Sequence, residues 1–281
     1  MKHQITLGVG PVSFRIGSDW HGPIAALDAL YHDYPRPGFA DYSVRLEAIS
    51  PWRRWIRPSI RVRGDYWLPD ASPLPRAQGL LAAEMGMNLQ VALGHRRHLL
   101  IHAAVVARGD RAILMSGVSG AGKSTLALML SQRGWRFLGD EFAMIDPETG
   151  WVHPFPRPVS LKNESLELIP DEYRVGPLLA GTPKGDVRHV APPTAAIAAM
   201  DEPARPALLV FPRFGFPSAL GGLAASETFV RLTQASTNYV AMGEAGFRTL
   251  VRLRGRIPAV ALDYPDGATG VAAVEALWDA L

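Results

Sequence analysis

Cysteine is absent from the 281 residues of this chain. Without it the protein can form neither disulfide bonds nor thiolate metal sites, so the sequence carries no sign of the redox state of its compartment. Long apolar runs are also missing, and none approaches the roughly 20 residues that a membrane-spanning helix needs. The beginning, MKHQITLGVGPVSFRIGSDW, lacks the apolar segment and cleavage site of a secretory signal. These absences predict a cytoplasmic protein with no membrane partner.

Neither sign of charge is in large excess, since 29 Lys and Arg face 26 Asp and Glu, a net charge of +3. The densest basic stretch, WRRWIRPSIRVRG from Trp52 to Gly64, mixes arginine with tryptophan as an RNA or phosphopeptide groove does. A strand pair with solvated arginines on one face is the interpretation we favour, because the charge is not sustained elsewhere. Nucleic acid is therefore not expected as a partner. Lysine is rare, which makes Lys123, Lys162 and Lys184 conspicuous.

Two patterns divide the chain, and a hydrophobic content of 48% is enough to give each part a core. Up to His95, the stretches VSFRI, YSVRLEA and SIRVR alternate apolar with polar residues, which is typical of half-buried strands; GPIAALDALY and the residues after Pro75 have helical spacing. From Leu99 onward, apolar runs alternate with helical segments, which predicts an α/β domain on a mostly parallel or mixed sheet. We expect a smaller β-rich α+β domain over 1–95 and a second domain over 96–281. In the second domain, strands are expected at 99–107, 112–116, 135–146, 158–162, 186–190, 207–211 and 259–264, and helices at 123–134, 225–235, 243–253 and 270–281.

The stretch GVSGAGKS, Gly117 to Ser124, fits the P-loop (Walker A) pattern G-x-x-x-x-G-K-[ST] at every fixed position. Such a loop works because glycines expose successive backbone N–H groups around a phosphate, while the next helix directs its positive end at the same anion. The strand AILMS before it and the helix KSTLALML after it supply the required context. Lys123 is expected to contact the β- and γ-phosphates of ATP, and Ser124 to supply a hydroxyl to Mg²⁺. The expected nucleotide-binding residues are Gly117, Ser119, Gly120, Ala121, Gly122, Lys123, Ser124 and Thr125.

Phosphoryl transfer also needs a carboxylate near the metal, and Asp140 and Glu141 at the end of an apolar strand are the candidates. Their alternative role is to cap a turn or face solvent. His102, within LLIHAAVV, is by itself more typical of a hydrogen-bonded core histidine than of a catalytic one. Arg157 and Lys162 flank a short strand, and either can neutralise charge on the transferring phosphoryl group; we favour Lys162.

Four further residues have a weaker claim to the site. Lys184, Arg188 and His189 lie in a segment bounded by glycine and proline that suits a mobile substrate loop. Arg213, in FPRF, has a similar claim. For each of them a solvated surface position is the alternative.

The run from His102 through SGAGKS to LALMLSQRGWRFLGDE resembles the catalytic core of the HPr kinase/phosphorylase family. That family has a histidine on the strand before a G-x-S-G-x-G-K-S loop, an RG ending the following helix, and two acids the same distance beyond. The whole chain is more similar to its relatives called HPr kinase-related kinase A, through RPVSLKN, FPRF and STNYVAMGEAGF. The resemblance implies a P-loop kinase domain with a mixed, twisted sheet and flanking helices behind a β-rich domain. It also implies assembly into a homo-oligomer.

By the same resemblance, His102 is a catalytic residue beside the two acids. Glu141 falls where the family has its general base, and Asp140 assists the metal or orients His102. Two departures matter. Thr125 replaces the glutamate that follows G-K-S in typical HPr kinases, and Glu141 replaces an aspartate, so the choice of base between Asp140 and Glu141 stays open. The stretch that the family uses for its protein substrate and for dephosphorylation is not recoverable, so neither phosphorylase activity nor HPr as substrate follows.

These patterns predict an ATP-dependent, Mg²⁺-requiring kinase that phosphorylates a hydroxyl, with a serine of a protein or peptide as the acceptor that the resemblance suggests. Related P-loop enzymes act on metabolites, so a small-molecule hydroxyl is the first alternative. A P-loop NTPase switch without phosphoacceptor is the second, although the N-K-x-D motif of GTPases and the L-S-G-G-Q signature of ABC-type ATPases are both absent. A binding module that has lost catalysis is a third, and the intact loop and acids argue against it.

Overall fold

The computed structural model describes residues 2–182 and 185–281. The chain is a mixed α/β protein that forms two compact units. The first consists of Met1–His95 and Ser160–Ala191, and the second of Arg96–Val159 and Pro192–Leu281. The segment 160–191 thus packs in the first unit, although the sequence-based division at 95 places it in the second domain. Within the described residues, no helix is both long and apolar enough to cross a membrane.

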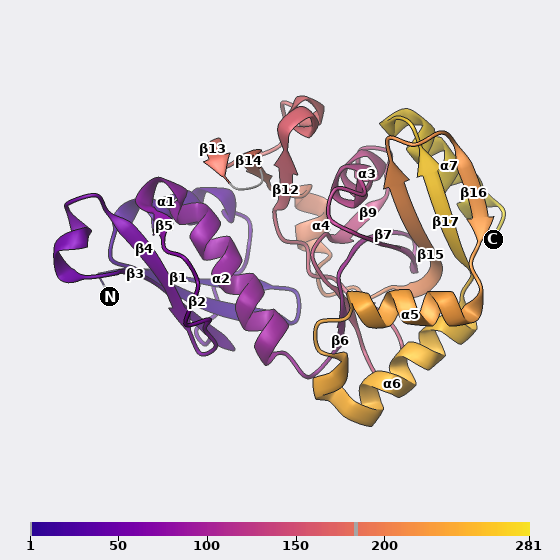
Figure 1. Cartoon of the computed structure of the whole chain (residues 1–281), viewed down its shortest axis with the longest axis horizontal. Coiled ribbons are helices and arrows are strands. Elements are labelled where there is room, and N and C mark those ends of the chain that lie inside the picture. Colours follow the sequence, from indigo (N-terminus) through magenta and orange to yellow (C-terminus); the bar gives the residue numbers. More distant parts are fainter. Residues whose placement is uncertain (1, 183–184) are drawn as a thin grey trace. The chain divides into compact units, whose positions relative to one another are not determined.

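The first unit is built on a five-stranded sheet in the order β1-β2-β3-β4-β5. Its strands are β1 (His3–Val9), β2 (Val12–Ser18), β3 (Tyr42–Ala48), β4 (Ser59–Gly64) and β5 (Leu74–Pro75). Strand β2 is parallel to β3, with α1 (His21–Leu30) in the crossover, and the other pairs are antiparallel. Helix α2 (Gly79–Gly94) packs closely on β3, because a Cβ on Gly86 would lie only 2.6 Å from Val44 Cγ1. Figure 1 shows α1 and α2 alongside these strands.

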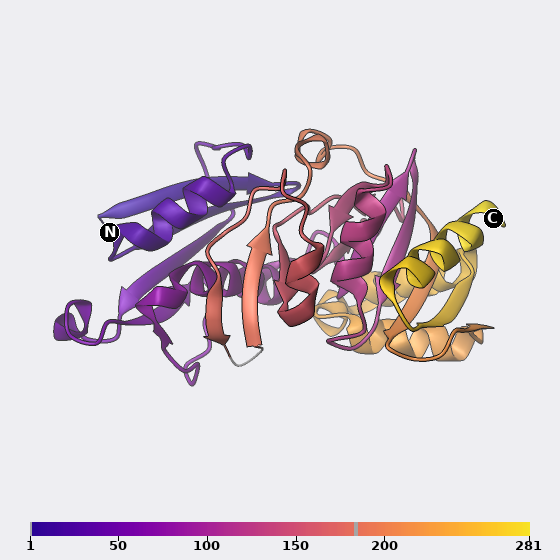
Figure 2. The same ribbon diagram turned by 90° about the horizontal axis from the view of Figure 1, so that it is seen from above.

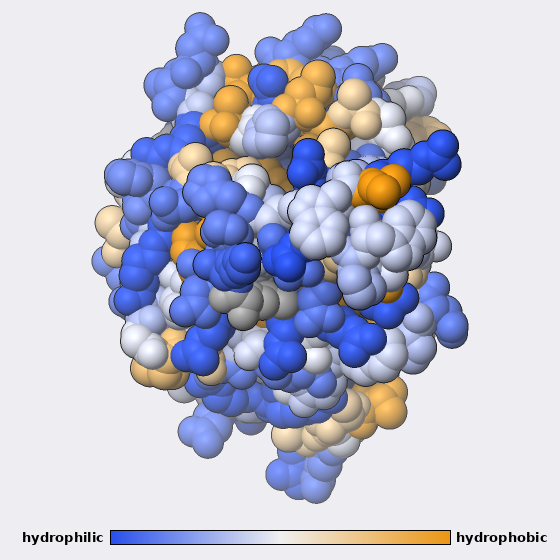
Figure 3. Space-filling model, turned by 90° about the vertical axis from the view of Figure 1, so that its left-hand side faces the viewer, coloured by the Kyte–Doolittle hydropathy of each residue, from blue (hydrophilic) through white to orange (hydrophobic). Residues whose placement is uncertain are grey.

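The basic stretch lies in and before β4, where Arg63 pairs with Arg45 of β3 and lies 3.6 Å from the carboxylate of Glu47. Ile60, between the arginine positions, is buried. Arg61 and Arg63 therefore lie on one face of a strand pair, as the sequence analysis favoured, whereas the other arginines of the stretch lie before β4. Trp55, in the turn before β4, is 75% exposed. Figure 3, a view of the left-hand side of the molecule in Figure 1, shows a mostly hydrophilic face with hydrophobic residues in separate small groups.

A three-stranded sheet in the order β12-β14-β13 completes the first unit (Figure 2). Its strands are β12 (Val159–Lys162), β13 (Leu179–Thr182) and β14 (Gly185–Val190), and a 3-10 helix spans Asn163–Leu168. The ion pair of Arg174 with Asp33, at 2.7 Å, ties this segment to the N-terminal part of the unit. Residues 160–191 thereby belong to the same unit as the first sheet, although the 64 residues 96–159 of the other unit lie between the two parts in the sequence.

The second unit contains a six-stranded mixed sheet in the order β16-β17-β15-β8-β7-β9. The strands are β7 (Ala103–Arg108), β8 (Arg111–Ser116), β9 (Arg136–Gly139), β15 (Arg205–Phe214), β16 (Ala219–Gly222) and β17 (Ala259–Tyr264). The helices are α3 (Lys123–Ser131), α4 (Thr194–Ala198), α5 (Ala225–Ala235), α6 (Tyr239–Arg256) and α7 (Gly267–Asp279). Leu232 of α5 and Leu250 of α6 join the buried core formed with β15 and β8. The mixed sheet with flanking helices confirms the predicted α/β class.

A second, small sheet joins β6 (Leu99–Ile101), β10 (Ala143–Ile145) and β11 (Val152–His153) in the order β11-β10-β6. The prediction of continuous strands at 99–107 and 135–146 was wrong. The first breaks at His102, whose N–H donates to the carbonyl of Ala235 rather than to a neighbouring strand, and the second breaks at 140–142. In both places the chain leaves one sheet and enters the other. Both breaks fall on candidate catalytic residues.

A histidine pair lies at the far end of β6 from His102. His98 is 8% exposed, and its ring centroid lies 4.7 Å from that of His153, whose Nε2 is 3.7 Å from Asp146 Oδ2. Burial first, and then the nearby His153 and Arg97, lower the pKa of His98 to about 4, against the opposing effect of Asp146. His98 is therefore neutral in the folded protein over most of the acidic range.

Acidification is expected to destabilise the protein through His98. Below the unfolded pKa of about 6.5 the unfolded chain binds a proton that the folded chain does not bind. The free energy of unfolding should therefore fall by about 2 to 3 kcal/mol between pH 7 and pH 4 on account of this residue. Urea denaturation at pH 7, 5.5 and 4 measures the fall. A His98→Gln variant should lack that part of it, and an identical pH dependence in both proteins would contradict the assignment.

Candidate functional site

Four strands of the large sheet end at one edge. Strand β15 is parallel to β8 and β17, and β7 is antiparallel to both β8 and β9, so β8, β9, β15 and β17 all run in one direction. Their carboxyl ends and the amino end of β7 therefore lie together. In open α/β sheets this is the edge where ligands bind. The candidates His102, Asp140 and Glu141 and the P-loop motif all lie here, at the strand ends.

The segment Gly117–Gly122, here called the glycine loop, connects β8 to α3. Gly120 and Gly122 have φ angles of 84° and 88°, in the left-handed region that favours glycine. At Gly122 the space is also closed, because a Cβ there would lie 2.3 Å from Tyr264 Oη. Helix α3 begins at Lys123, directly after the loop, so its positive end faces the loop. This arrangement fits a bound phosphate group.

Lys123 lies folded over the glycine loop. The residue is 6% exposed, and its Nζ donates to the carbonyls of Gly117 at 2.7 Å and Val118 at 3.0 Å. The ammonium group is therefore held at the loop, where it can contact phosphate oxygens. Ser124 and Thr125 follow in the first turn of α3 and are half-buried. The expected nucleotide-binding residues are thus contiguous in space as well as in sequence.

His102 contacts Glu141 across the breaks in the two strands. Its Nδ1 lies 3.0 Å from the backbone carbonyl of Glu141 and 3.7 Å from Glu141 Oε1. A carbonyl can only accept, so this hydrogen bond places a proton on Nδ1. The side chains are 38% and 41% exposed, so His102 is not a buried core histidine. Ser116, the last residue of β8, donates its hydroxyl to the His102 carbonyl at 3.0 Å, which ties the pair to the start of the glycine loop.

Arg157 approaches the same edge. Phe155 forms a parallel bridge with Gly139, the last residue of β9, so Arg157 and Glu141 each lie two residues beyond the bridged positions. Arg157 is 4% exposed, and its guanidinium lies 5.7 Å from the centroid of the Phe155 ring. Of the two cations flanking the predicted strand 158–162, Arg157 is the one in the unit that carries the glycine loop.

The other candidates between residues 160 and 191 belong to the first unit, whereas the glycine loop belongs to the second. Lys162 ends β12, in the first unit. Arg188 and His189 belong to β14 of that unit, and His189 is buried, so neither is part of a mobile loop. Lys184 lies outside the described residues. The prediction that Lys162 completes the site stays a prediction.

Arg213 is committed to an ion pair with a residue that the sequence analysis did not select. It binds Asp263 of β17 through two hydrogen bonds, of which Nε to Oδ1 measures 2.7 Å. These bonds lower the pKa of the Asp263 carboxyl and raise the pKa of Arg213. The only signal for Asp263 was an acid at the end of the apolar stretch AVALDY. Tyr264, the next residue, was also missed; burial raises its pKa to about 12, and its hydroxyl donates to the Ala121 carbonyl at 3.4 Å.

The described residues, 2–182 and 185–281, contain no group of three or more His, Asp or Glu side chains that could hold a metal ion. Mg²⁺ in a phosphate site needs fewer protein ligands, because it keeps waters and binds the phosphates themselves. Ser124 and Asp140 as its ligands stay a prediction.

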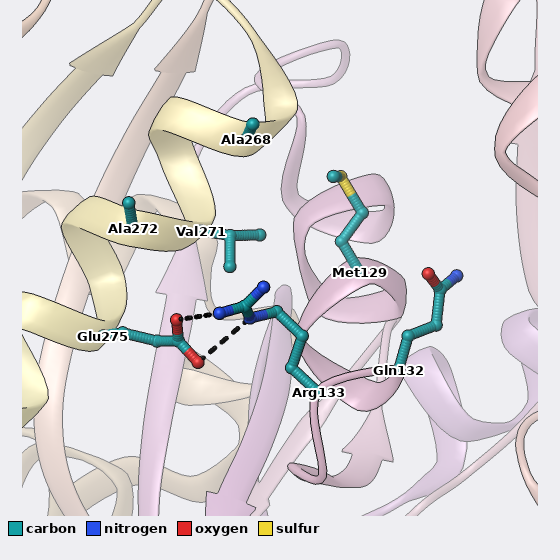
Figure 4. A pocket seen from close by; sticks show the side chains of 7 residues that line it. All are labelled: Met129, Gln132, Arg133, Ala268, Val271, Ala272 and Glu275. Carbon is teal, nitrogen blue, oxygen red and sulfur yellow. Dashed lines mark hydrogen bonds and ion pairs between the residues drawn. The ribbon is translucent and has the colours of Figure 1, made fainter.

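A cavity of about 360 Å³ lies between α3 and α7, at the end of α3 remote from Lys123 (Figure 4). Its walls are Met129, Gln132, Arg133, Ala268, Val271, Ala272 and Glu275. Arg133 and Glu275 pair across it, with Nη2 and Oε2 3.0 Å apart, and this pairing lowers the pKa of Glu275. The cavity is separate from the sheet edge that carries the glycine loop.

The fold and the sheet edge define a mixed α/β protein with a glycine loop. A scan of the sequence against models of known protein families finds no match, and a search of curated proteins finds none either. Among solved structures, the chain is similar to the HPr(Ser) kinase/phosphatase from Coxiella burnetii. The TM-score is 0.29 and the identity 12%, over 64% of this chain and 93% of that chain. A likeness this low carries no argument about function, and the resemblance to HPr kinases stays a prediction.

Proposed function

We propose that this chain is an ATP-dependent kinase that transfers the γ-phosphoryl group to a hydroxyl. One observation carries the proposal. The glycine loop with Lys123 lies at the same sheet edge as the His102–Glu141 pair, so a phosphate-binding element and a carboxylate stand together. Phosphoryl transfer is catalysed mainly by positioning and charge stabilisation, and these are the two functions that such an edge supplies.

Each residue of the site would have its own role in phosphoryl transfer. The loop amides and Lys123 hold the β- and γ-phosphates and stabilise the charge that develops on them. Ser124 and Asp140 hold Mg²⁺, which neutralises phosphate charge when it is bound. Glu141 accepts the proton of the acceptor hydroxyl as its oxygen forms a bond to the γ-phosphorus and the bond to the β-phosphate oxygen breaks, leaving ADP. His102 holds the Glu141 backbone through Nδ1 and so positions this acid.

The acceptor that we propose is a serine hydroxyl of a protein or peptide. This part rests on the sequence resemblance alone. A small-molecule hydroxyl and water are the competing acceptors, and the same experiment separates all three.

A single-turnover assay with γ-labelled ATP, Mg²⁺ and cell extract split into protein and metabolite fractions tests the proposal. Label should move to the protein fraction, and Lys123→Ala should slow its transfer by about 10²- to 10³-fold, because a group that stabilises the transition-state charge is lost. Lys2→Ala, which removes an exposed lysine far from the loop in sequence, is the matched control and should change nothing.

Label in the metabolite fraction would replace the serine acceptor by a small molecule. Label released only as free phosphate would contradict the kinase and favour the NTPase switch. A transfer rate that is equal in the Lys123→Ala and wild-type proteins would contradict the role of the glycine loop.

A further inference from the structure

Two half-exposed aromatic rings lie at the end of β15, where the strand borders the glycine loop: Phe214 ends the strand and Phe216 follows it. Phe214 and Phe216 are each 47% exposed. A Cβ on Gly122 would lie 3.0 Å from Phe214 Cβ, and one on Gly117 would lie 3.6 Å from the Pro212 carbonyl oxygen. The end of β15 therefore borders the glycine loop along its length, with the Phe214 ring beside the loop and Phe216 two residues further along the chain.

The turn that carries the two rings is fixed by contacts to β17. The Gly215 N–H donates to the Tyr264 carbonyl at 2.9 Å, and Arg213 is held by its two hydrogen bonds to Asp263. The Arg213 guanidinium lies 4.6 Å from the centroid of the Phe216 ring. The Phe214 ring meets the Tyr264 ring edge to face at 5.8 Å. Rings held in place in this way lose little entropy when a flat ligand packs on them.

The order of the sheet gives the direction in which a nucleotide would lie. Strand β8, which leads into the glycine loop, has β7 and β9 with His102 and the acids on one side, and β15 and β17 on the other. A γ-phosphate directed at Glu141 therefore leaves the α-phosphate and the nucleoside on the side of β15. Phe214 and Phe216 are the exposed aromatic side chains at that end of β15.

We propose that Phe214 and Phe216, here called the aromatic ledge, bind the base of the nucleotide by stacking. The inference rests on the proposed function, because it takes the phosphate position from the glycine loop. Stacking reads the flat face of a base, which every base presents. The ledge would thus set the affinity for a nucleotide over a bare phosphate chain.

Calorimetric titration of the full chain with MgATP and with magnesium tripolyphosphate tests the ledge. Wild-type protein should bind MgATP more tightly than tripolyphosphate, which lacks a base. Phe214→Ala, Phe216→Ala or both should weaken MgATP binding by about tenfold or more, because a stacked base contributes that much affinity. Tripolyphosphate binding should not change. Phe247→Ala, which removes a ring that is 48% exposed on α6, is the matched control and should bind both ligands as wild type does.

Three results would overturn the ledge. The first is equal affinity of the wild-type protein for MgATP and tripolyphosphate, which leaves the phosphate site standing without a base site. The second is unchanged MgATP affinity in both ledge variants. The third is an equal loss for both ligands, which would make the rings supports of the glycine loop. If the wild-type protein binds neither ligand, the proposed function itself fails.

Discussion

Replacing Glu141 by glutamine lowers the rate of phosphoryl transfer by about 10²- to 10⁴-fold, the range that a general base contributes. Glutamine keeps the size of the side chain but cannot take up the proton of the acceptor hydroxyl. The backbone carbonyl that accepts the His102 hydrogen bond is untouched by the substitution, so the strand break should keep its geometry. Single-turnover rates with γ-labelled ATP measure the loss, and titration with MgATP should show unchanged nucleotide affinity.

Asp140→Asn is the matched control for this substitution, since it changes the neighbouring acid in the same bend. If Asp140 is a ligand of Mg²⁺, the variant should need a higher Mg²⁺ concentration, and raising that concentration should restore much of its rate of phosphoryl transfer. The opposite pattern would contradict the assignment of Glu141 as the base. A rate within tenfold of wild type for Glu141→Gln, together with a Mg²⁺-insensitive loss for Asp140→Asn, would make Asp140 the base.

Local sequence pattern was sufficient to predict the strands that stay within one sheet and the helices that follow them. The strand before the glycine loop and the helix after it were expected at 112–116 and 123–134, and they form as β8 and α3. Local pattern failed where a strand changes sheets. On either side of the breaks, the runs 99–107 and 135–146 are largely apolar because both halves of each are buried, and hydrophobic periodicity cannot show that the two halves have different neighbours.

The interruptions nevertheless carried a signal. His102 and Asp140 are polar positions inside apolar runs, and each lies at a point where the backbone leaves the sheet. Pairings between distant segments had no local signal at all. Arg213 and Asp263 meet only because β15 and β17 pair in parallel, and Lys162 lies in a strand that packs with the first unit. Such contacts depend on the topology of the whole chain.

Gly122→Ala is expected to lower the free energy of unfolding by about 2 to 4 kcal/mol and to abolish detectable MgATP binding. Two costs add. An alanine at a φ of 88° is strained, and its Cβ would meet Tyr264 Oη at 2.3 Å, so the glycine loop must move. Gly120→Ala is the matched control, because its φ is 84° but nothing lies within 4 Å of the added Cβ. It should show only the strain, about 1 to 2 kcal/mol.

The collision can be tested separately with Tyr264→Phe, which removes the atom that the new Cβ meets first. Alone, this change should cost less than about 1 kcal/mol, because the hydrogen bond from Tyr264 to the Ala121 carbonyl is long, at 3.4 Å. Combined with Gly122→Ala it should recover about 1 to 2 kcal/mol, since close contacts to Phe214 and to the Tyr264 ring remain. Urea denaturation of the wild-type protein, the two single variants and the double variant gives the coupling energy between Gly122→Ala and Tyr264→Phe. A coupling energy of zero, or a Gly122→Ala variant as stable as Gly120→Ala, would mean that the loop does not rest against Tyr264.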